Sequence, residues 1–438
     1  MREIPTLSAA RAELQAGTQS PLGLLEDCLR NLHAAEQEVR AWVVVDEAAA
    51  RRRAEELAAL RPEQRAALPL FGIPLGVKDI IDVAGLPTRS GSAYSSAAPA
   101  LRDAPLVGRL RAAGAIVLGK TVTTEYAYLD PPVTRNPWNL ERTPGGSSSG
   151  SAAAVAARMC CAALGTQTGG SVIRPAAFCG VVGFKPSFGW CDLAGVFPLA
   201  PTLDHLGLLT RSVADAAHLF DVLADAPASN AAAADEPPRL GRFREFFQTH
   251  AAPVVQAGLD RAFDQLRRAG AEVFDLALPQ AFAAVIERHF LLMSAQTARI
   301  HQDAYERNRG QLGPRLREFV ERGLSYTAAE FDEAVVHQQA FRETMESLLR
   351  AERCVAAMPS ALTAAVPPET TGDARFTAPW SYSGLPAISL PCGLDPEGLP
   401  LGLQLVGSAG DERALLRSAA WCESALNFTA RPQALDHV

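Results

Sequence analysis

The sequence predicts an α/β fold in which segments from both halves of the chain build one β-sheet. Two observations carry this prediction. Helix-like segments alternate with short apolar segments of the kind that form buried strands. Strand-like segments also stand on both sides of a long helical stretch, which favours one domain around one sheet over two independent domains.

The first part of the chain is predicted to be a helical arm that leads into a buried core. Ser8 is a candidate helix cap, and the residues up to 60 combine helical apolar spacing with many strong helix formers. From Leu68 the pattern changes to apolar runs broken by Gly and Pro, which predicts strands with bends. The expected elements are a bent strand over 71–79, a helix over 104–113, a strand over 115–118 and an Ala-rich helix over 151–161.

The second part is predicted to begin with a low-complexity surface connector at 226–238. Helices are expected over 251–270 and from about 291 to 350, and strands over 387–390 and 401–406. We therefore expect a single domain over residues 1–438. Its parts are a helical N-terminal arm (1–60), a core (68–215), a mainly helical insertion (239–350) and C-terminal strands with a helix (351–438).

Composition excludes several classes of function. The 438 residues are 48% hydrophobic and carry a formal net charge of −7, without a strong basic patch, so we expect no nucleic-acid partner. No apolar run approaches the roughly 20 residues that span a bilayer, and no secretory signal is visible. The eight cysteines lack metal-ligand spacing, which predicts reduced thiols, no metal and no cofactor. We expect a cytoplasmic protein without a membrane partner, and a homodimer is a reasonable guess for its assembly.

Three segments carry chemistry when they are considered together. Lys78 ends an apolar run, the Gly145–Ser151 segment is a Gly/Ser loop before a helix, and Gly169-Gly170-Ser171 follows a short strand. A serine hydroxyl needs an adjacent base, and a lysine is a base only when neutral, which burial favours. A second serine can pass the proton between them. Consecutive glycines let backbone N–H groups converge on an oxyanion.

These segments resemble the amidase signature family, and the resemblance runs from about residue 5 to residue 425. It is carried by the following motifs: Gly72-Ile73-Pro74-Leu75-Gly76-Val77-Lys78-Asp79, Thr134-Arg135-Asn136-Pro137-Trp138-Asn139, the Gly/Ser loop, Thr168-Gly169-Gly170-Ser171, Pro175–Pro186, Gly384–Ile388 and Gly398–Gln404. The resemblance implies a central mixed β-sheet sandwiched by helices and a metal-free Ser-Ser-Lys triad that hydrolyses a small linear amide to a carboxylate and ammonia or an amine.

The resemblance also implies roles for single residues. Ser171 is the nucleophile that forms the acyl-enzyme, Ser147 is the bridging serine, usually held by a cis peptide, and Lys78 is the base. The oxyanion hole is implied to consist of the backbone N–H groups of Thr168, Gly169, Gly170 and Ser171.

Two departures from the family pattern bear on the substrate. Gln167 stands where many members carry Asp, and the arginine after the nucleophile stands at Arg174, one position later than usual. This Ser-Val-Ile-Arg-Pro form resembles malonamidase-like amidases, in which the arginine binds a substrate carboxylate. Arg174 is therefore a candidate substrate-binding residue, and the alternative is that it only braces the loop by bonding backbone carbonyls.

Four other interpretations compete with this one. Gly114–Thr121 matches the P-loop pattern by letter, but its centre is strand-like and a helix precedes it. Gly146-Ser147-Ser148-Ser149-Gly150 matches a nucleophile elbow, but no strand leads into it. The same fold and triad also occur in the A subunit of a tRNA-dependent amidotransferase, and the same chemistry occurs in hydrolases of urea-like amides such as biuret. The pocket is expected from the 126–133 loop, the helical insertion and the 360–383 segment.

Overall fold

One large mixed sheet organises the chain. The structure, a computed structural model, describes residues 2–224, 236–307 and 309–435, so most of the connector predicted at 226–238 lies outside the described residues. Within the described part, eleven strands form one sheet in the order β1-β3-β2-β4-β6-β5-β10-β11-β9-β7-β8. The strands are β1 (Trp42–Val45), β2 (Pro74–Lys78), β3 (Ile116–Thr121), β4 (Ala162–Gln167), β5 (Val182–Lys185), β6 (His205–Thr210), β7 (Arg239–Phe243), β8 (Glu272–Leu276), β9 (Val355–Pro359), β10 (Ala387–Leu394) and β11 (Pro400–Val406).

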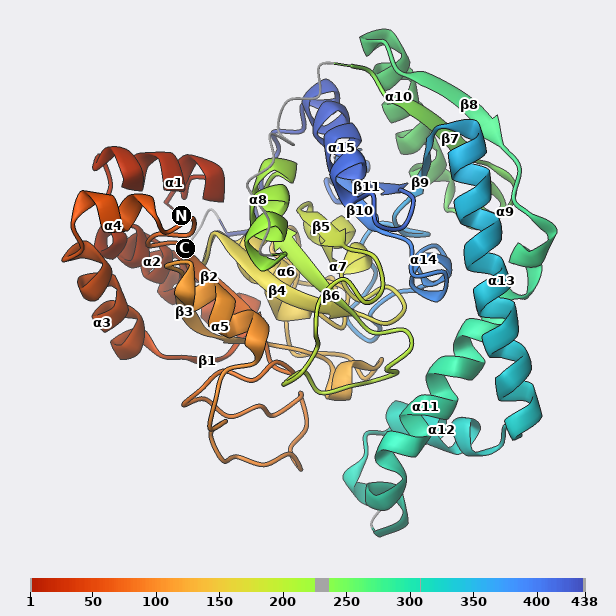
Figure 1. Cartoon of the computed structure of the whole chain (residues 1–438), viewed down its shortest axis with the longest axis horizontal. Helices are drawn as coiled ribbons and strands as arrows, with labels where there is room; N and C mark the ends of the chain where they lie inside the picture. Colours follow the sequence, from red (N-terminus) through yellow and green to blue (C-terminus); the bar gives the residue numbers. More distant parts are fainter. Residues whose placement is uncertain (1, 225–235, 308, 436–438) are drawn as a thin grey trace.

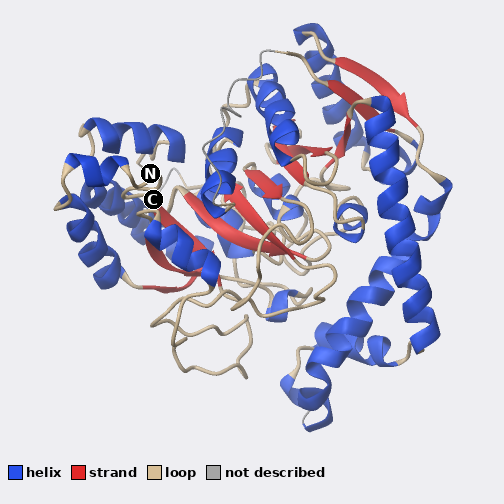
Figure 2. Ribbon diagram, viewed as in Figure 1, coloured by secondary structure: helices blue, strands red, loops and turns tan. Residues whose placement is uncertain are grey.

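Helices flank this sheet, which confirms the predicted fold class (Figures 1 and 2). The helices are α1 (Leu7–Ala16), α2 (Pro21–Val39), α3 (Glu47–Ala58), α4 (Pro62–Ala66), α5 (Pro105–Ala112), α6 (Ser149–Ala156), α7 (Ile173–Cys179), α8 (Val213–Leu223), α9 (Glu245–His250), α10 (Pro253–Ala269), α11 (Val285–Arg307), α12 (Pro314–Leu324), α13 (Ala328–Glu352), α14 (Ala378–Tyr382) and α15 (Glu412–Leu426). Helices α12 and α13 both pack on α11, and this group of helices projects from the body (Figure 1). No helix in the described ranges is long and apolar enough to cross a membrane.

Two local predictions were wrong. Residues Trp42–Val45, predicted as part of the helical arm, form β1, which pairs antiparallel with β3. The Ala-rich helix begins earlier and ends earlier than predicted, as α6. The insertion, predicted as mainly helical, also contains β7 and β8, and β7 joins the main sheet through β9. In each strand, pairing with a distant strand decides the conformation, and helical propensity cannot report such pairing. The four-part division of a single domain stays a prediction.

The segment that matches the P-loop pattern is a buried strand. Residues Ile116–Thr121 form β3 inside the sheet, between β1 and β2. The Lys120 ammonium is fully buried and lies 2.9 Å from Asp79 Oδ1. It also donates to the Pro87 carbonyl and to Thr88 Oγ1. Because this lysine is held inside the protein, the structure supports the rejection of a phosphate-binding loop.

The Lys120–Asp79 pair gives a stability prediction. Lys120→Met is expected to lower the free energy of unfolding by about 3–5 kcal/mol, because it leaves the Asp79 carboxylate buried without its counter-charge. Urea unfolding followed by circular dichroism measures the change. The double variant Lys120→Met/Asp79→Asn removes both charges and is expected to lose less than the single variant. A double variant that loses at least as much would show that the charge pair is not the cause.

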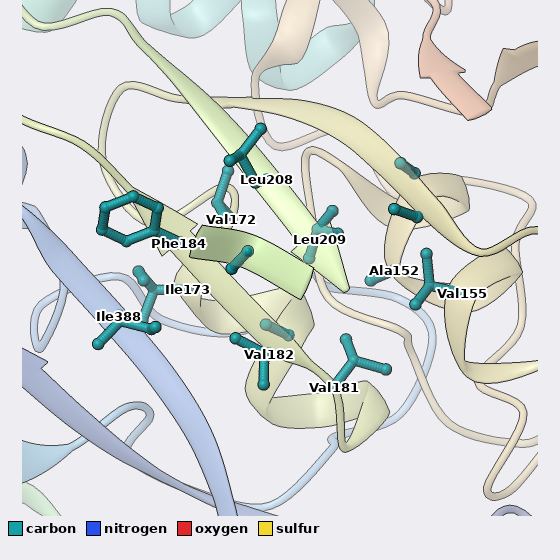
Figure 3. Packing of buried hydrophobic residues seen from close by; sticks show 14 of the residues in the cluster. Ala152, Val155, Val172, Ile173, Val181, Val182, Phe184, Leu208, Leu209 and Ile388 are labelled. Carbon is teal, nitrogen blue, oxygen red and sulfur yellow. The ribbon is translucent and has the colours of Figure 1, made fainter. Parts of the chain in front are cut away.

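The region just after Ser171 is anchored in the hydrophobic core. Val172 and Ile173 are fully buried. Figure 3 shows them in a cluster with Phe184, Leu208 and Ile388, whose backbones belong to β5, β6 and β10. A loop that leads directly into such a packed cluster has little freedom to move. The core thus positions the residue before it, Ser171.

Candidate active site

Lys78 lies at the end of β2, with its side chain fully buried. Its Nζ atom donates to Ser147 Oγ at 2.7 Å and to Thr166 Oγ1 at 2.8 Å. Burial lowers the pKa of this amine well below its usual value, and the negative charge of Asp204 opposes the shift only in part. The structure therefore places a lysine with a favoured neutral form in hydrogen-bond contact with a serine hydroxyl.

Ser147 lies in the Gly/Ser loop that precedes α6. The Gly146–Ser147 peptide bond is cis, as the family resemblance implies, and Ser147 is buried. The next serine, Ser148, bonds the Thr166 backbone through its hydroxyl, and its N–H donates to the Ser171 carbonyl at 3.2 Å. This backbone contact joins the two serine loops. The residues before Ser147 form no strand, which agrees with treating the elbow match as chance.

Ser171 ends a loop that leaves β4 and enters α7. It is 8% exposed, against 1% for Ser147, and lines a pocket. Among the described residues, no hydrogen bond joins the Ser147 hydroxyl to the Ser171 hydroxyl. Catalytic hydrogen bonds in a free enzyme are often long and tighten only when substrate binds.

The loop before Ser171 has its carbonyl groups occupied and its N–H groups free. The carbonyls of Thr168 and Gly169 accept from His289 Nε2 and Ser381 Oγ, and the Gly170 carbonyl accepts from the Arg174 N–H. Within the described ranges, the N–H groups of Gly169, Gly170 and Ser171 have no such partner. Free, fixed N–H groups beside a hydroxyl are the donors that an oxyanion needs.

Gly170 is required by space as well as by chemistry. A Cβ at this position would lie 2.2 Å from Thr377 Oγ1 and 3.1 Å from Arg174 Nη1. Any larger residue would push the loop out of place. Thr168, the first residue of the expected oxyanion hole, serves as an anchor. Its hydroxyl donates to Asp204 Oδ1 at 2.6 Å, and its carbonyl faces His289.

Arg174 lies in the first turn of α7 and is 1% exposed. Its Nη2 donates to the Gly146 carbonyl at 2.7 Å and to Thr371 Oγ1, so the bracing contact is present. Its Nε and Nη1 atoms have no partner among the described residues, and the side chain lines the pocket. Burial lowers the Arg174 pKa to about 10, so the guanidinium stays charged at neutral pH. The structure thus combines a brace with unused donors.

A cavity of about 370 Å³ opens beside Ser171. Three segments far apart in the sequence build its walls: residues 127–129, one face of α11 and residues 373–378. These are the segments expected from the sequence. At the rim, Arg375 and Asp373 form a half-exposed ion pair at 2.7 Å. The size suits a small substrate rather than a protein chain.

Sequence reasoning missed two residues of this site. Asp204 is partly buried and accepts hydrogen bonds from the Thr168 hydroxyl and from the N–H groups of Leu199 and Ala200. His289, on α11, lines the pocket and bonds the Thr168 carbonyl. Neither residue belongs to a motif, and both reach the site from other segments. An isolated Asp after a Pro-Thr-Leu loop, or a His on a helix, gives no signal without the fold.

The described residues contain no group of three or more His, Cys, Asp or Glu side chains placed to hold a metal ion. What they do bring together is a buried amine, two serines, free backbone donors and a pocket. These are the parts required for acyl transfer through a serine nucleophile.

Comparisons with known proteins agree with this chemistry. A family model described as Amidase matches residues 23–416. The A subunit of a glutamyl-tRNA(Gln) amidotransferase from Roseiflexus castenholzii is 37% identical over 471 residues, which covers 94% of each chain. The crystal structure of an amidase matches with a TM-score of 0.87 at 34% identity, over 96% of this chain and 99% of the other.

A further solved structure matches with a TM-score of 0.87 at 26% identity, over 98% of this chain and 100% of the other. It is described as a vestigial protein complex that reveals the evolutionary origins of an s-triazine catabolic enzyme. The similar curated proteins include further amidotransferase A subunits, among them one from Myxococcus xanthus that is 34% identical over 97% of this chain and 98% of its own length, so the comparisons do not specifically support a malonamidase-like enzyme.

Proposed function

The chain belongs to the amidase family, and from this premise we propose that it hydrolyses a small linear amide through an acyl-enzyme on Ser171. The observation that carries the proposal is the 2.7 Å hydrogen bond between the buried Lys78 amine and Ser147, one loop away from a pocket that contains Ser171. A neutral lysine in this position supports a proton relay that a solvated ammonium could not start.

The proposed reaction has two halves. Ser171 Oγ attacks the amide carbon while its proton passes to Ser147 Oγ and the Ser147 proton passes to Lys78 Nζ. The N–H groups of Gly169, Gly170 and Ser171 stabilise the oxyanion. The proton then returns through Ser147 to the leaving nitrogen, the C–N bond breaks and ammonia or an amine departs. Water attacks the acyl-enzyme by the same relay, which releases a carboxylate and restores Ser171.

Arg174 supports a substrate with an acidic group. The Arg174 side chain lines the pocket next to Ser171, and its Nη1 and Nε donors are buried without a partner. A local shift that exposes these donors to the pocket would let the guanidinium bind a carboxylate through two parallel hydrogen bonds. The favoured substrate in this proposal is a short half-amide with a carboxylate at its other end. This is the finer, malonamidase-like interpretation of the sequence.

The charge preference is testable with two substrates of similar size, succinamate and butyramide. Arg174→Ala removes the brace to Gly146, so both substrates are expected to lose turnover. Succinamate is expected to lose a further 1.5–3 kcal/mol or roughly 10- to 150-fold in kcat/KM, the usual size for hydrogen bonds to a charged group. Steady-state ammonia release measures both losses. Equal losses on the two substrates would show that Arg174 only braces the loop.

A second candidate function is that of an amidotransferase A subunit. The similarity to curated subunits of this kind, across 94% of both chains, favours this alternative over a free-standing hydrolase. In that case glutamine is the amide, and a protein complex and tRNA are partners. The absence of a nucleic-acid partner therefore stays a prediction of the sequence.

Activity of the isolated chain separates the two candidates. We expect the purified chain to release ammonia from small acidic amides alone, after dialysis against EDTA, because the described site is complete within one chain. The assay compares succinamate with glutamine, with and without the other subunits of an amidotransferase. The second candidate would be favoured if the chain releases ammonia from glutamine but not from succinamate, and does so only after those subunits are added.

A further inference from the structure

His289 contacts the loop before Ser171 from the helical insertion. It lies on α11, together with Ile286, Phe290 and Met293, on the face that lines the cavity. Its Nε2 atom is 2.9 Å from the Thr168 carbonyl oxygen. A carbonyl oxygen only accepts hydrogen bonds, so the proton of the neutral ring lies on Nε2. Burial lowers the His289 pKa to about 4, so the ring is neutral at physiological pH.

The other ring nitrogen is consequently an acceptor. With the proton on Nε2, Nδ1 carries a lone pair. Among the described residues this atom has no hydrogen-bond partner, and the ring lines the pocket. A neutral acceptor that the protein leaves unused beside a substrate cavity discriminates in favour of an N–H donor, because an apolar group there would leave the lone pair unpaired.

His289 and Arg174 act on neighbouring parts of one space. A Cβ on Gly169 would lie 3.3 Å from His289 Cε1, and a Cβ on the next residue, Gly170, would lie 3.1 Å from Arg174 Nη1. Ala374 borders both positions, at 3.9 and 3.3 Å. An anion-binding guanidinium and a neutral acceptor are therefore placed side by side along the loop that ends in Ser171.

We propose that His289 Nδ1 accepts a hydrogen bond from a substrate N–H outside the scissile bond, so that His289 selects acidic amides that carry a second N–H group. The proposal rests on the proposed function and deepens it: Arg174 binds the carboxylate, and His289 binds the N–H. In chemical terms, the substrate class is a carboxylate-bearing amide or ureide, rather than a purely aliphatic half-amide.

Two isosteric ligands test this directly. N-carbamoylglycine and succinamate have the same length, primary amide and carboxylate, and differ by one NH in place of one CH₂. Ser171→Ala allows binding to be measured by calorimetry without turnover. We expect it to bind N-carbamoylglycine about 10-fold more tightly, the size of one hydrogen bond. Equal affinities, tighter binding of succinamate or no binding of either ligand would overturn the proposal.

The variant His289→Lys separates the acceptor from the brace. The lysine ammonium can still donate to the Thr168 carbonyl, but it has no atom that accepts a hydrogen bond. In the Ser171→Ala background it is expected to erase the preference for N-carbamoylglycine over succinamate, and the added charge acts on the carboxylate of both ligands alike. His301→Lys is the matched control, since His301 is a buried histidine on the same helix that does not line the cavity, and it is expected to keep the preference. Persistence of the preference in His289→Lys would contradict the assignment.

Failure of this inference is distinguishable from failure of the proposed function. Ammonia release by the unmodified chain from any small amide supports hydrolysis whatever the role of His289. Equal binding of N-carbamoylglycine and succinamate would count only against the role of His289, because it says nothing about whether amides are hydrolysed. A chain that hydrolyses amides but binds both isosteres equally retains the proposed function and loses the substrate class.

Discussion

Ser171→Ala is expected to lower kcat for amide hydrolysis by roughly 10⁴-fold or more, because the acyl-enzyme has no other place to form. Ser171 lies at the end of the loop with free N–H donors, and Val172 and Ile173 anchor it in the core. Ammonia release under saturating substrate measures the loss. The thermal unfolding transition of the variant serves as the control for folding, since one hydroxyl in a partly open pocket contributes little to stability. A folded variant with a substantial fraction of the original turnover would contradict the role of Ser171.

Lys78→Met is expected to lower kcat by on the order of 10²- to 10⁴-fold, the usual contribution of a general base. Methionine fills much of the same space without a titratable group, so the loss reports on the amine rather than on a cavity. Lys185→Met is the matched control. Lys185 is also fully buried, and burial lowers its pKa too, but it bonds the Pro186 and Leu385 carbonyls away from the pocket.

The pH dependence of the rate is expected to differ between Lys78→Met and its control Lys185→Met in a defined direction. Burial lowers the Lys78 pKa, so the neutral, active form persists to lower pH than in a free lysine. The rate of the unmodified chain is expected to fall as the pH decreases through the Lys78 pKa, because protonation removes the base. Lys78→Met is expected to lose this acidic limb, and Lys185→Met to keep it. An identical acidic limb in Lys78→Met would assign the titration to another group.

Lys78, Ser147 and Ser171 could be selected as candidates from the sequence because each stands in a local motif with its own physical reason. Lys78 ends an apolar strand, and each of the two serines follows glycines, which are needed where the backbone approaches another group closely. These motifs do not show how close the lysine and the two serines lie to one another, and the fold determines those distances. β2 and β4 are parallel neighbours, so Lys78 and the end of β4 at Thr166 meet at one edge of the sheet.

The residues that shape the pocket were not predictable in the same way. His289 comes from a helix more than a hundred positions beyond Ser171, and Asp204 from a loop before β6. Their roles depend on tertiary placement that leaves no periodic signal in the chain. The strand at Trp42–Val45 was missed for a related reason. It is four residues long, lies between helices, and is stabilised by pairing with β3 rather than by local preference.

For Arg174, the structure shows the bracing contact, and substrate binding stays a prediction. The structure gives its Nη2 to the Gly146 carbonyl and leaves Nη1 and Nε without a partner among the described residues. One guanidinium can brace the loop and keep donors for a ligand, because it carries five N–H groups on a rigid plane. The sequence places the arginine near the nucleophile, but it does not show which of its N–H groups bond the protein and which have no partner there.

A covalent adduct on the enzyme would locate the acyl-enzyme that we expect on Ser171. The purified chain is treated with a fluorophosphonate probe, digested and analysed by tandem mass spectrometry. We predict one adduct, on the peptide and side chain of Ser171, which Ser171→Ala abolishes. An adduct on Ser147 or Ser148 alone, with Ser171 unmodified, would contradict this prediction.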